Sequence, residues 1–405
     1  MINYKKMYVF LSILLIMVQT TACAPEEKKG NVEKSTVNLD TKQDTASGGS
    51  IKSMLEDTPS HINKVLSENY IVDADVHIPV VEKADVLYAK YKKFDEQTLV
   101  SAFYDKKKPE KETDSEGYTL FKDGNSEVVI CDSYIYYSTE DYQYIKYPTD
   151  DFGSKNNSDI GEKDFDEVYK KDNLKFMTRE KAMQTACDFL KKLSIDNIDH
   201  AVENTEIYAI DFETMQKVQE EKKQKDIDLQ RQAGISPISD PTMGYKTKNK
   251  FTQEDEFYVI FFTIKQNGIP VTQKSYDLNE TRSISGSTVE VLLSKKGVIK
   301  FACYSIYEVK KIAESPATLL SAEQAIQKAY EIYDSVISTD KVTIKTIDFE
   351  YVPVAYNNNY NEVKLTPAWS MVLTCKGESE KEGKSETYEI NKILYINAVT
   401  GEEIK

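Results

Sequence analysis

Apolar residues recur at helical spacing in two segments of this chain, and the two segments align with each other without a gap. Residues 178–190 match residues 321–333 in their order of apolar and polar positions. The apolar residues of each fall on one helical face; they are Ala182, Met183, Ala186, Phe189, Leu190 and Leu193 in the first, and Ala325, Ile326, Ala329, Ile332 and Tyr333 in the second. The pattern predicts two amphipathic helices that each cover a sheet.

Both predicted helices begin with a capping signal. Thr178 and Ser321 stand where a side-chain oxygen would accept hydrogen bonds from the first turn of the backbone. Ser321 with Gln324 also fits a capping box, in which each side chain bonds the backbone N–H of the other residue.

Strand-like segments follow each helix. After the first come residues 206–210, 257–264, 269–271, 289–293 and 298–302, with turns at Asn267–Gly268 and at 295–297. After the second come residues 342–354, 365–375 and 388–399. A helix followed by antiparallel strands, twice, predicts an α+β fold.

An insertion at residues 211–255 separates the first helix from most of its strands. Phe212 to Ala233 is rich in Glu, Lys and Gln, and Gly234 and Pro237 follow. This predicts a helix that ends near Gly234 and is largely solvated. A docking helix for a partner is the alternative interpretation.

Residues 61–150 predict a smaller, separate α+β domain. Asp95 can cap a short helix that runs to Phe103, and residues 118–121, 127–137 and 142–147 suggest a strand meander. Four tyrosines fall in pairs on two of these strands, Tyr134 with Tyr136 and Tyr142 with Tyr144. They are candidate contacts for sugar rings, although packing between strands is the simpler explanation.

The N-terminal segment resembles a bacterial lipoprotein signal peptide. Lys5 and Lys6 precede the apolar run Met7–Val18, and Thr20-Thr21-Ala22-Cys23 closes it, with Thr20 where Leu is usual. The run has about a dozen residues, whereas a spanning helix needs roughly twenty. We therefore expect residues 1–22 to be removed and Cys23 to carry a diacylglycerol, which anchors the chain on the extracytoplasmic face of the cell membrane. An ordinary secreted protein or an uncleaved anchor is the alternative.

Residues 23–60 contain no aromatic residue and are rich in Lys, Glu, Ser and Thr, so they predict a disordered tether. The formal charge of the chain is -15. A nucleic-acid partner is not expected, because phosphate binding requires clustered Lys and Arg on one face.

Catalytic and metal-binding patterns are weak. Ser338-x-x-Lys341 has the spacing of a nucleophile motif but lies between a helix and a strand. His61, His77 and His200 are isolated, and residues 156–167 lack the acids that a calcium loop needs. We expect no enzyme activity and no cofactor, with an unrecognised hydrolase as an alternative. The cysteines Cys131, Cys187, Cys303 and Cys375 are expected to be thiols rather than disulfides.

The capped helices, the sequence Asn267-Gly-Ile-Pro-Val271 and the closing segment 396–404 together resemble PepSY modules. The whole layout resembles uncharacterised lipoproteins of Gram-positive Firmicutes. The predicted order is a signal peptide (1–22), a tether (23–60), an α+β domain (61–150), an acidic linker (151–173), and PepSY-like modules at 174–312 and 313–405. The resemblance implies a protein-binding or regulatory role at the envelope. A wall-glycan binder is the alternative.

Overall fold

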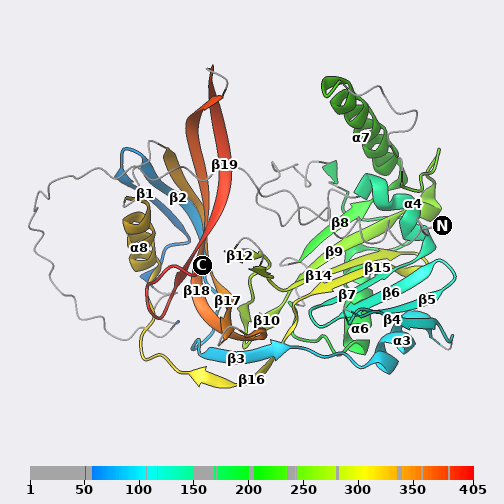
Figure 1. The fold of residues 1–405 in the computed structure, drawn as a ribbon, viewed down its shortest axis with the longest axis horizontal. Coiled ribbons are helices and arrows are strands. Elements are labelled where there is room, and N and C mark those ends of the chain that lie inside the picture. Colours follow the sequence, from blue (N-terminus) through cyan, green and yellow to red (C-terminus); the bar gives the residue numbers. More distant parts are fainter. Residues whose placement is uncertain are drawn as a thin grey trace, which may run out of the picture. The chain divides into compact units, whose positions relative to one another are not determined.

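The strands of this protein are divided between two large sheets, and the fold is mixed α+β (Figure 1). The computed structural model describes residues 51, 57–105, 107–115, 117–149, 168–169, 171–199, 205–234, 242, 244–279, 282–334, 340–356, 359–381 and 384–405. All of these residues fall within a single compact unit, Ala46–Lys405.

The first sheet has seven strands in the order β1-β2-β17-β18-β3-β16, and β19 also pairs with β18. Only the β2–β17 pairing is parallel. β3 and β19 pair with successive parts of β18, at residues 362–365 and 368–381. The strands are β1 (His61–Ser67), β2 (Tyr70–His77), β3 (Val86–Tyr91), β16 (Tyr307–Glu314), β17 (Lys341–Tyr356), β18 (Asn359–Lys381) and β19 (Lys384–Asn397).

The second sheet has eight antiparallel strands in the order β4-β5-β6-β7-β15-β14-β9-β8. They are β4 (Glu110–Thr113), β5 (Thr119–Asp123), β6 (Ser126–Cys131), β7 (Tyr134–Ser138), β8 (Glu206–Ile210), β9 (Phe257–Thr263), β14 (Thr288–Ser294) and β15 (Gly297–Tyr304). Short hairpins join β10 (Lys265–Gln266) to β11 (Ile269–Pro270) and β12 (Tyr276–Asn279) to β13 (Arg282–Ile284).

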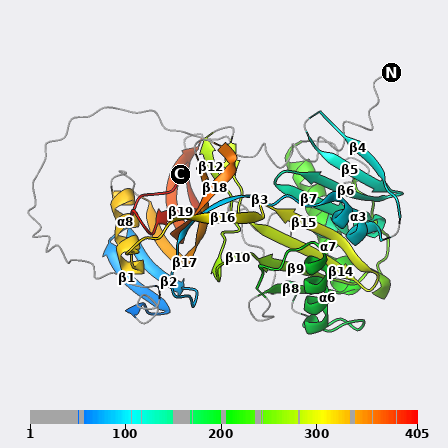
Figure 2. The same cartoon turned by 90° about the horizontal axis from the view of Figure 1, so that it is seen from below.

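The helices are α3 (Glu96–Tyr104), α4 (Glu140–Thr149), α6 (Arg179–Lys192), α7 (Phe212–Gln232) and α8 (Ala322–Asp334), with a short 3₁₀ turn at Gln253–Asp255. α6 packs against β8, β9 and β14, whereas α8 packs against β19. Figure 2 shows α8 beside the seven-stranded sheet and α6 beside the eight-stranded sheet. Each of the two predicted amphipathic helices therefore does cover a sheet.

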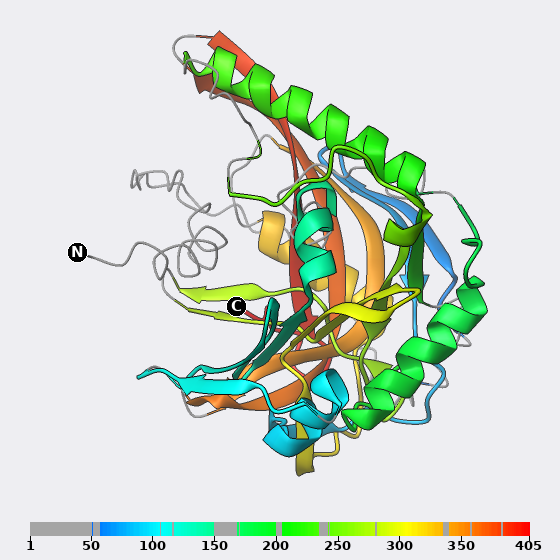
Figure 3. The same ribbon diagram turned by 90° about the vertical axis from the view of Figure 1, so that its right-hand side faces the viewer.

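The predicted local signals are confirmed. Asp95 accepts from the Thr98 backbone N–H at 2.8 Å and begins α3. Ser321 and Gln324 exchange hydrogen bonds of 2.9 and 3.3 Å at the start of α8. Asn267 and Gly268 both have positive φ (51° and 83°), as a two-residue hairpin turn requires. The inserted segment forms α7, which Figure 3 shows as a long helix.

The predicted strand at residues 142–147 is wrong, because this segment forms the helix α4. Its buried residues Tyr142, Ile145 and Thr149 follow a helical spacing, and Glu140 and Asp141 occupy the first turn, where acids favour a helix. Tyr142 and Tyr144 are two residues apart, which is the spacing of a strand face. That spacing led to the strand prediction, although the helix signals were also present in the sequence.

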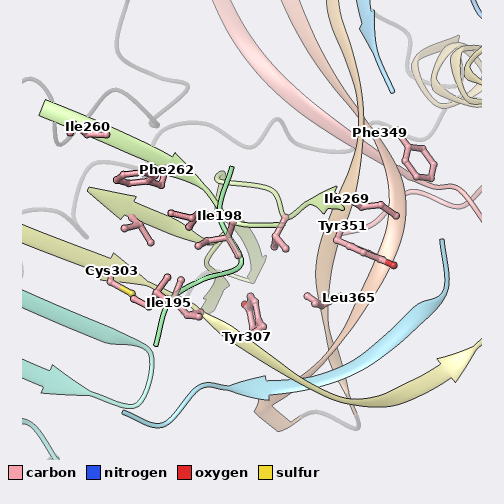
Figure 4. Close-up of a cluster of buried hydrophobic side chains, with 14 of the residues drawn as sticks. Ile195, Ile198, Ile260, Phe262, Ile269, Cys303, Tyr307, Phe349, Tyr351 and Leu365 are labelled. Atoms are coloured by element: carbon pink, nitrogen blue, oxygen red, sulfur yellow. The ribbon is translucent and has the colours of Figure 1, made fainter. Parts of the chain in front are cut away.

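Residues 61–150 do not form a sheet of their own. β1, β2 and β3 belong to the seven-stranded sheet, whereas β4 to β7 belong to the eight-stranded sheet. A buried apolar cluster also runs through both sheets, and Figure 4 shows part of it around Phe262, Tyr307 and Tyr351. This region is therefore part of the same core as the two predicted modules.

Candidate functional site

Tyr134 and Tyr136 lie on one face of β7, as predicted, with ring centroids 6.1 Å apart. Tyr304 of β15 stands directly opposite Tyr134, and their ring centroids are 4.6 Å apart. Burial raises the pKa of Tyr134 and Tyr136 above the ordinary tyrosine value. The side chain of Tyr304 is 41% exposed, so the aromatic group reaches solvent there.

The other two predicted tyrosines lie on α4 rather than on a strand. Tyr142 is buried in the same apolar cluster as Tyr136, and its hydroxyl contributes to the raised pKa of Tyr136. Tyr144 instead contacts Lys246 and Lys248, whose ammonium groups are 5.5 and 5.4 Å from its ring. We call Tyr134, Tyr136, Tyr142 and Tyr304 the tyrosine cluster; Tyr144 is not part of it.

A buried ion pair lies within the tyrosine cluster. The Lys300 ammonium on β15 donates to both carboxylate oxygens of Glu290 on β14, at 2.8 and 2.7 Å. It also lies 5.3 Å from the centre of the Tyr142 ring. Burial alone would lower the pKa of Lys300, but the Glu290 carboxylate more than offsets this, and the pKa is raised. Lys300 is thus held as a cation.

A second polar group lies on the seven-stranded sheet, around Glu350 of β17. Burial, and then the nearby Asp348 carboxylate, raise the pKa of Glu350 to about 7, although the Thr272 hydroxyl and the Lys274 ammonium act in the opposite direction. The Thr272 hydroxyl also lies 3.3 Å from the Tyr395 hydroxyl. Glu350 therefore changes its protonation state near neutral pH, unlike an exposed carboxyl.

The residues around Glu350 come from four adjacent strands. His77, Asp348, Ser370 and Tyr395 are register neighbours on β2, β17, β18 and β19. A ring nitrogen of His77 is 2.7 Å from the Asp348 carboxylate. This row holds one carboxylate, that of Asp348, two residues from Glu350 on β17. It has no nucleophile–base hydrogen bond of the kind that covalent catalysis uses.

β19 has an open backbone edge. It pairs with β18 along its whole length, and no other strand among the described residues pairs with it. β17 stops pairing with β18 at Lys376, but β18 and β19 continue as a two-stranded ribbon to Lys381 and Lys384. Figure 1 shows this ribbon extending past its neighbouring strands.

The C-terminal tail covers only the base of that edge. The N–H of Ile404 donates to the carbonyl of Tyr395 at 2.9 Å, and the N–H of Asn397 donates to the carbonyl of Glu402 at 2.8 Å. Backbone groups of alternate residues point to the same side of a strand. The outward-pointing groups further along β19 therefore belong to Thr387, Glu389, Asn391 and Ile393.

The other residues considered for catalysis or metal binding do not come together in one site among the described residues. His61 contacts Asp75 and Asp73 at 2.8 and 3.3 Å, and the hydrogen bond with Asp75 raises its pKa. No group of three or more His, Cys, Asp or Glu within the described ranges is arranged to hold a metal ion. Cys131, Cys187, Cys303 and Cys375 are all free thiols, as expected, and all but Cys131 are buried.

Other predicted features lie outside the described residues. These are Cys23, His200, Ser338, most of the predicted tether 23–60 and the acidic segment 156–167. Within the predicted tether, Ile51 is described and is fully buried in the core, so the prediction of disorder is wrong there. Among the described residues, no helix combines the length and the apolar character that crossing a membrane requires.

Comparison with known proteins identifies a fold but no activity. No protein-family model matches the chain, and no curated protein matches its sequence. The fold is similar to the crystal structure of an uncharacterized protein from Eubacterium rectale ATCC 33656, with a TM-score of 0.58 and 16% sequence identity. The similarity covers 88% of this chain and 97% of the other. At this level of identity the likeness extends to the fold alone.

Proposed function

We propose that this chain is a lipid-anchored, non-enzymatic protein on the extracytoplasmic face of the cell membrane, where it binds a protein partner. The open edge of β19 is the observation on which the proposal rests. A strand whose outward N–H and C=O groups have no partner can accept an extended peptide as an additional strand. In this mode the backbone supplies affinity, and alternate side chains supply specificity.

The exposed part of β19 carries charged residues of the kind that protect an edge strand from unwanted pairing. Glu389 and Lys392 are charged residues of this part, and Ile390 between them is 42% exposed. Charged residues along an edge suppress indiscriminate pairing with other strands. A partner that places complementary charges against them would still pair. The edge therefore selects for partners with such charges.

The order of elements supports the same proposal. A capped helix followed by an antiparallel meander occurs twice, as α6 with β8, β9, β14 and β15, and as α8 with β17, β18 and β19. PepSY-like modules, which this order resembles, inhibit proteases or regulate envelope processes in other proteins. The sequence at Lys5–Cys23 supports attachment through Cys23.

The experiment uses a photo-reactive amino acid at Thr387 in intact cells. Glu389→Pro removes one outward N–H but no hydrogen bond to β18, because proline is tolerated where a strand's N–H faces solvent. We expect a cross-linked partner in the parent and its loss in the Glu389→Pro variant. Cys23→Ser should release the chain from the membrane fraction.

Glu389→Ala is the matched control. Both substitutions remove the exposed ion pair between Glu389 and Lys376, at 2.8 Å, but alanine keeps the backbone N–H. The alanine variant should therefore cross-link like the parent. Equal cross-linking of the proline variant and the parent would contradict strand addition at β19.

A further inference from the structure

Two lysines on the seven-stranded sheet have no carboxylate partner among the described residues. Lys311 of β16 and Lys364 of β18 are the register neighbours of the same residue, Tyr88 of β3, which lies between them. Both lie over aromatic rings instead.

Aromatic rings form the centre of this surface. The Lys311 ammonium is 5.5 Å from the centre of the Tyr88 ring, and the Lys364 ammonium is 5.4 Å from that of Tyr356. The two rings meet edge to face at 5.3 Å. Tyr88 and Tyr356 are partly exposed, so their rings remain accessible from solvent.

A third lysine completes the arrangement. Lys90 lies 5.9 Å from the Tyr88 ring and 2.5 Å from the Glu362 carboxylate. Glu362 also accepts a hydrogen bond from the Tyr88 hydroxyl, which raises the pKa of Tyr88. The Lys90–Glu362 pair therefore holds Tyr88 in place. Lys311 and Lys364 have no such carboxylate partner among the described residues and remain available to a ligand.

Protection of a sheet edge does not explain both lysines. A lysine on an edge strand discourages pairing with other chains, which would account for Lys311 on β16. Lys364 is on β18, which has strands on both sides at that point. The two lysines are separated by two strand spacings, about 10 Å. A ligand with negative charges on both sides of an uncharged unit would fit this spacing.

We propose that Lys311, Tyr88, Lys364 and Tyr356 form a binding surface for a polymer in which phosphodiester groups alternate with polyol or sugar units. The ammonium groups bind the phosphates as point charges, and the tyrosine rings pack against the C–H faces of the uncharged units. This surface is separate from the β19 edge, so either proposal can fail without the other.

The test measures binding of the purified full-length chain, in detergent, to poly(glycerol phosphate), poly-glutamate and dextran. We expect binding to poly(glycerol phosphate), binding to poly-glutamate that is about tenfold weaker, and none to dextran. The double variant Lys311→Gln/Lys364→Gln should weaken binding to poly(glycerol phosphate) about tenfold and reduce its salt dependence by about one to two in slope.

Lys345→Gln/Lys376→Gln is the matched control, because it removes the same charge from the same sheet at lysines that pair with Asp73 and Glu389. It should bind like the parent. Equal weakening by the two double variants would show a response to net charge alone and would overturn the proposal. So would equal affinity for poly-glutamate, or no binding to poly(glycerol phosphate).

Discussion

The Lys300–Glu290 pair and the Glu350 carboxyl are charged groups set into the faces of the two large sheets, yet burial affects them differently. In the eight-stranded sheet, Lys300 and Glu290 compensate each other, and the lysine pKa is raised. In the seven-stranded sheet, burial and, to a lesser extent, the neighbouring Asp348 carboxylate raise the pKa of Glu350 to about 7. A neighbouring charge of opposite sign offsets desolvation at Lys300, whereas a neighbouring like charge adds to the effect of desolvation at Glu350.

The largest expected effect comes from breaking the compensated pair. Lys300→Met leaves the Glu290 carboxylate buried without its cation, and this should cost about 3–5 kcal/mol in the free energy of unfolding. Urea denaturation at pH 7 measures the loss. The double variant Lys300→Met/Glu290→Leu should recover most of it, because replacing a whole buried pair by apolar residues is often neutral or stabilising. A single variant that loses less than about 1 kcal/mol would show that the pair is not desolvated.

The Glu350 carboxyl should give the next largest effect, and a pH-dependent one. Its pKa is raised from 4.5 to about 7 in the folded chain. Below about pH 4.5 the carboxyl is protonated in both states; between 4.5 and 7 only the folded state keeps the proton, so stability falls as the pH rises. The cost above pH 7 is at most about 3 kcal/mol, and partial exposure reduces it.

Glu350→Gln should therefore stabilise the chain at pH 8 by about 1–3 kcal/mol and change little at pH 4. Urea denaturation at both pH values checks this. Glu389→Gln, an exposed position on the same sheet, should change stability by less than about 0.5 kcal/mol at either pH. A Glu350→Gln effect that is the same at pH 4 and pH 8 would refute the raised pKa.

The Lys300–Glu290 pair and Glu350 also differ in how far the sequence could predict them. Glu290 and Lys300 each stand inside an otherwise apolar strand that the sequence predicted, and the hairpin turn between those strands was predicted too. A charge within each of two paired apolar strands was a signal of a buried ion pair, and it was missed. Glu350 alternates with apolar residues in the predicted strand 342–354, as a solvent-facing residue would, so nothing in the sequence indicated its burial.

The fold shows a difference between features that depend on residues close in sequence and features that depend on distant ones. Caps and turns such as Asp95 and Asn267–Gly268 were predictable because their hydrogen bonds join residues only a few positions apart. The assignment of β1–β3 and β4–β7 to different sheets was not, because their partners β17, β18 and β15 lie more than a hundred residues away. Alternation of apolar residues predicts a strand but does not identify its partner.

The smallest expected effect separates the two causes of the Glu350 pKa. Burial is the larger cause and the Asp348 carboxylate the smaller, so Asp348→Asn should lower the pKa of Glu350 from about 7 only part of the way toward 4.5. NMR titration of the Glu350 side-chain carboxyl measures this. His77→Gln removes the residue that contacts Asp348 but leaves the carboxylate in place, so the pKa should not fall. If Asp348→Asn left the pKa at about 7, burial alone would account for it, and the contrast between like-charged and opposite-charged neighbours would fail at this site.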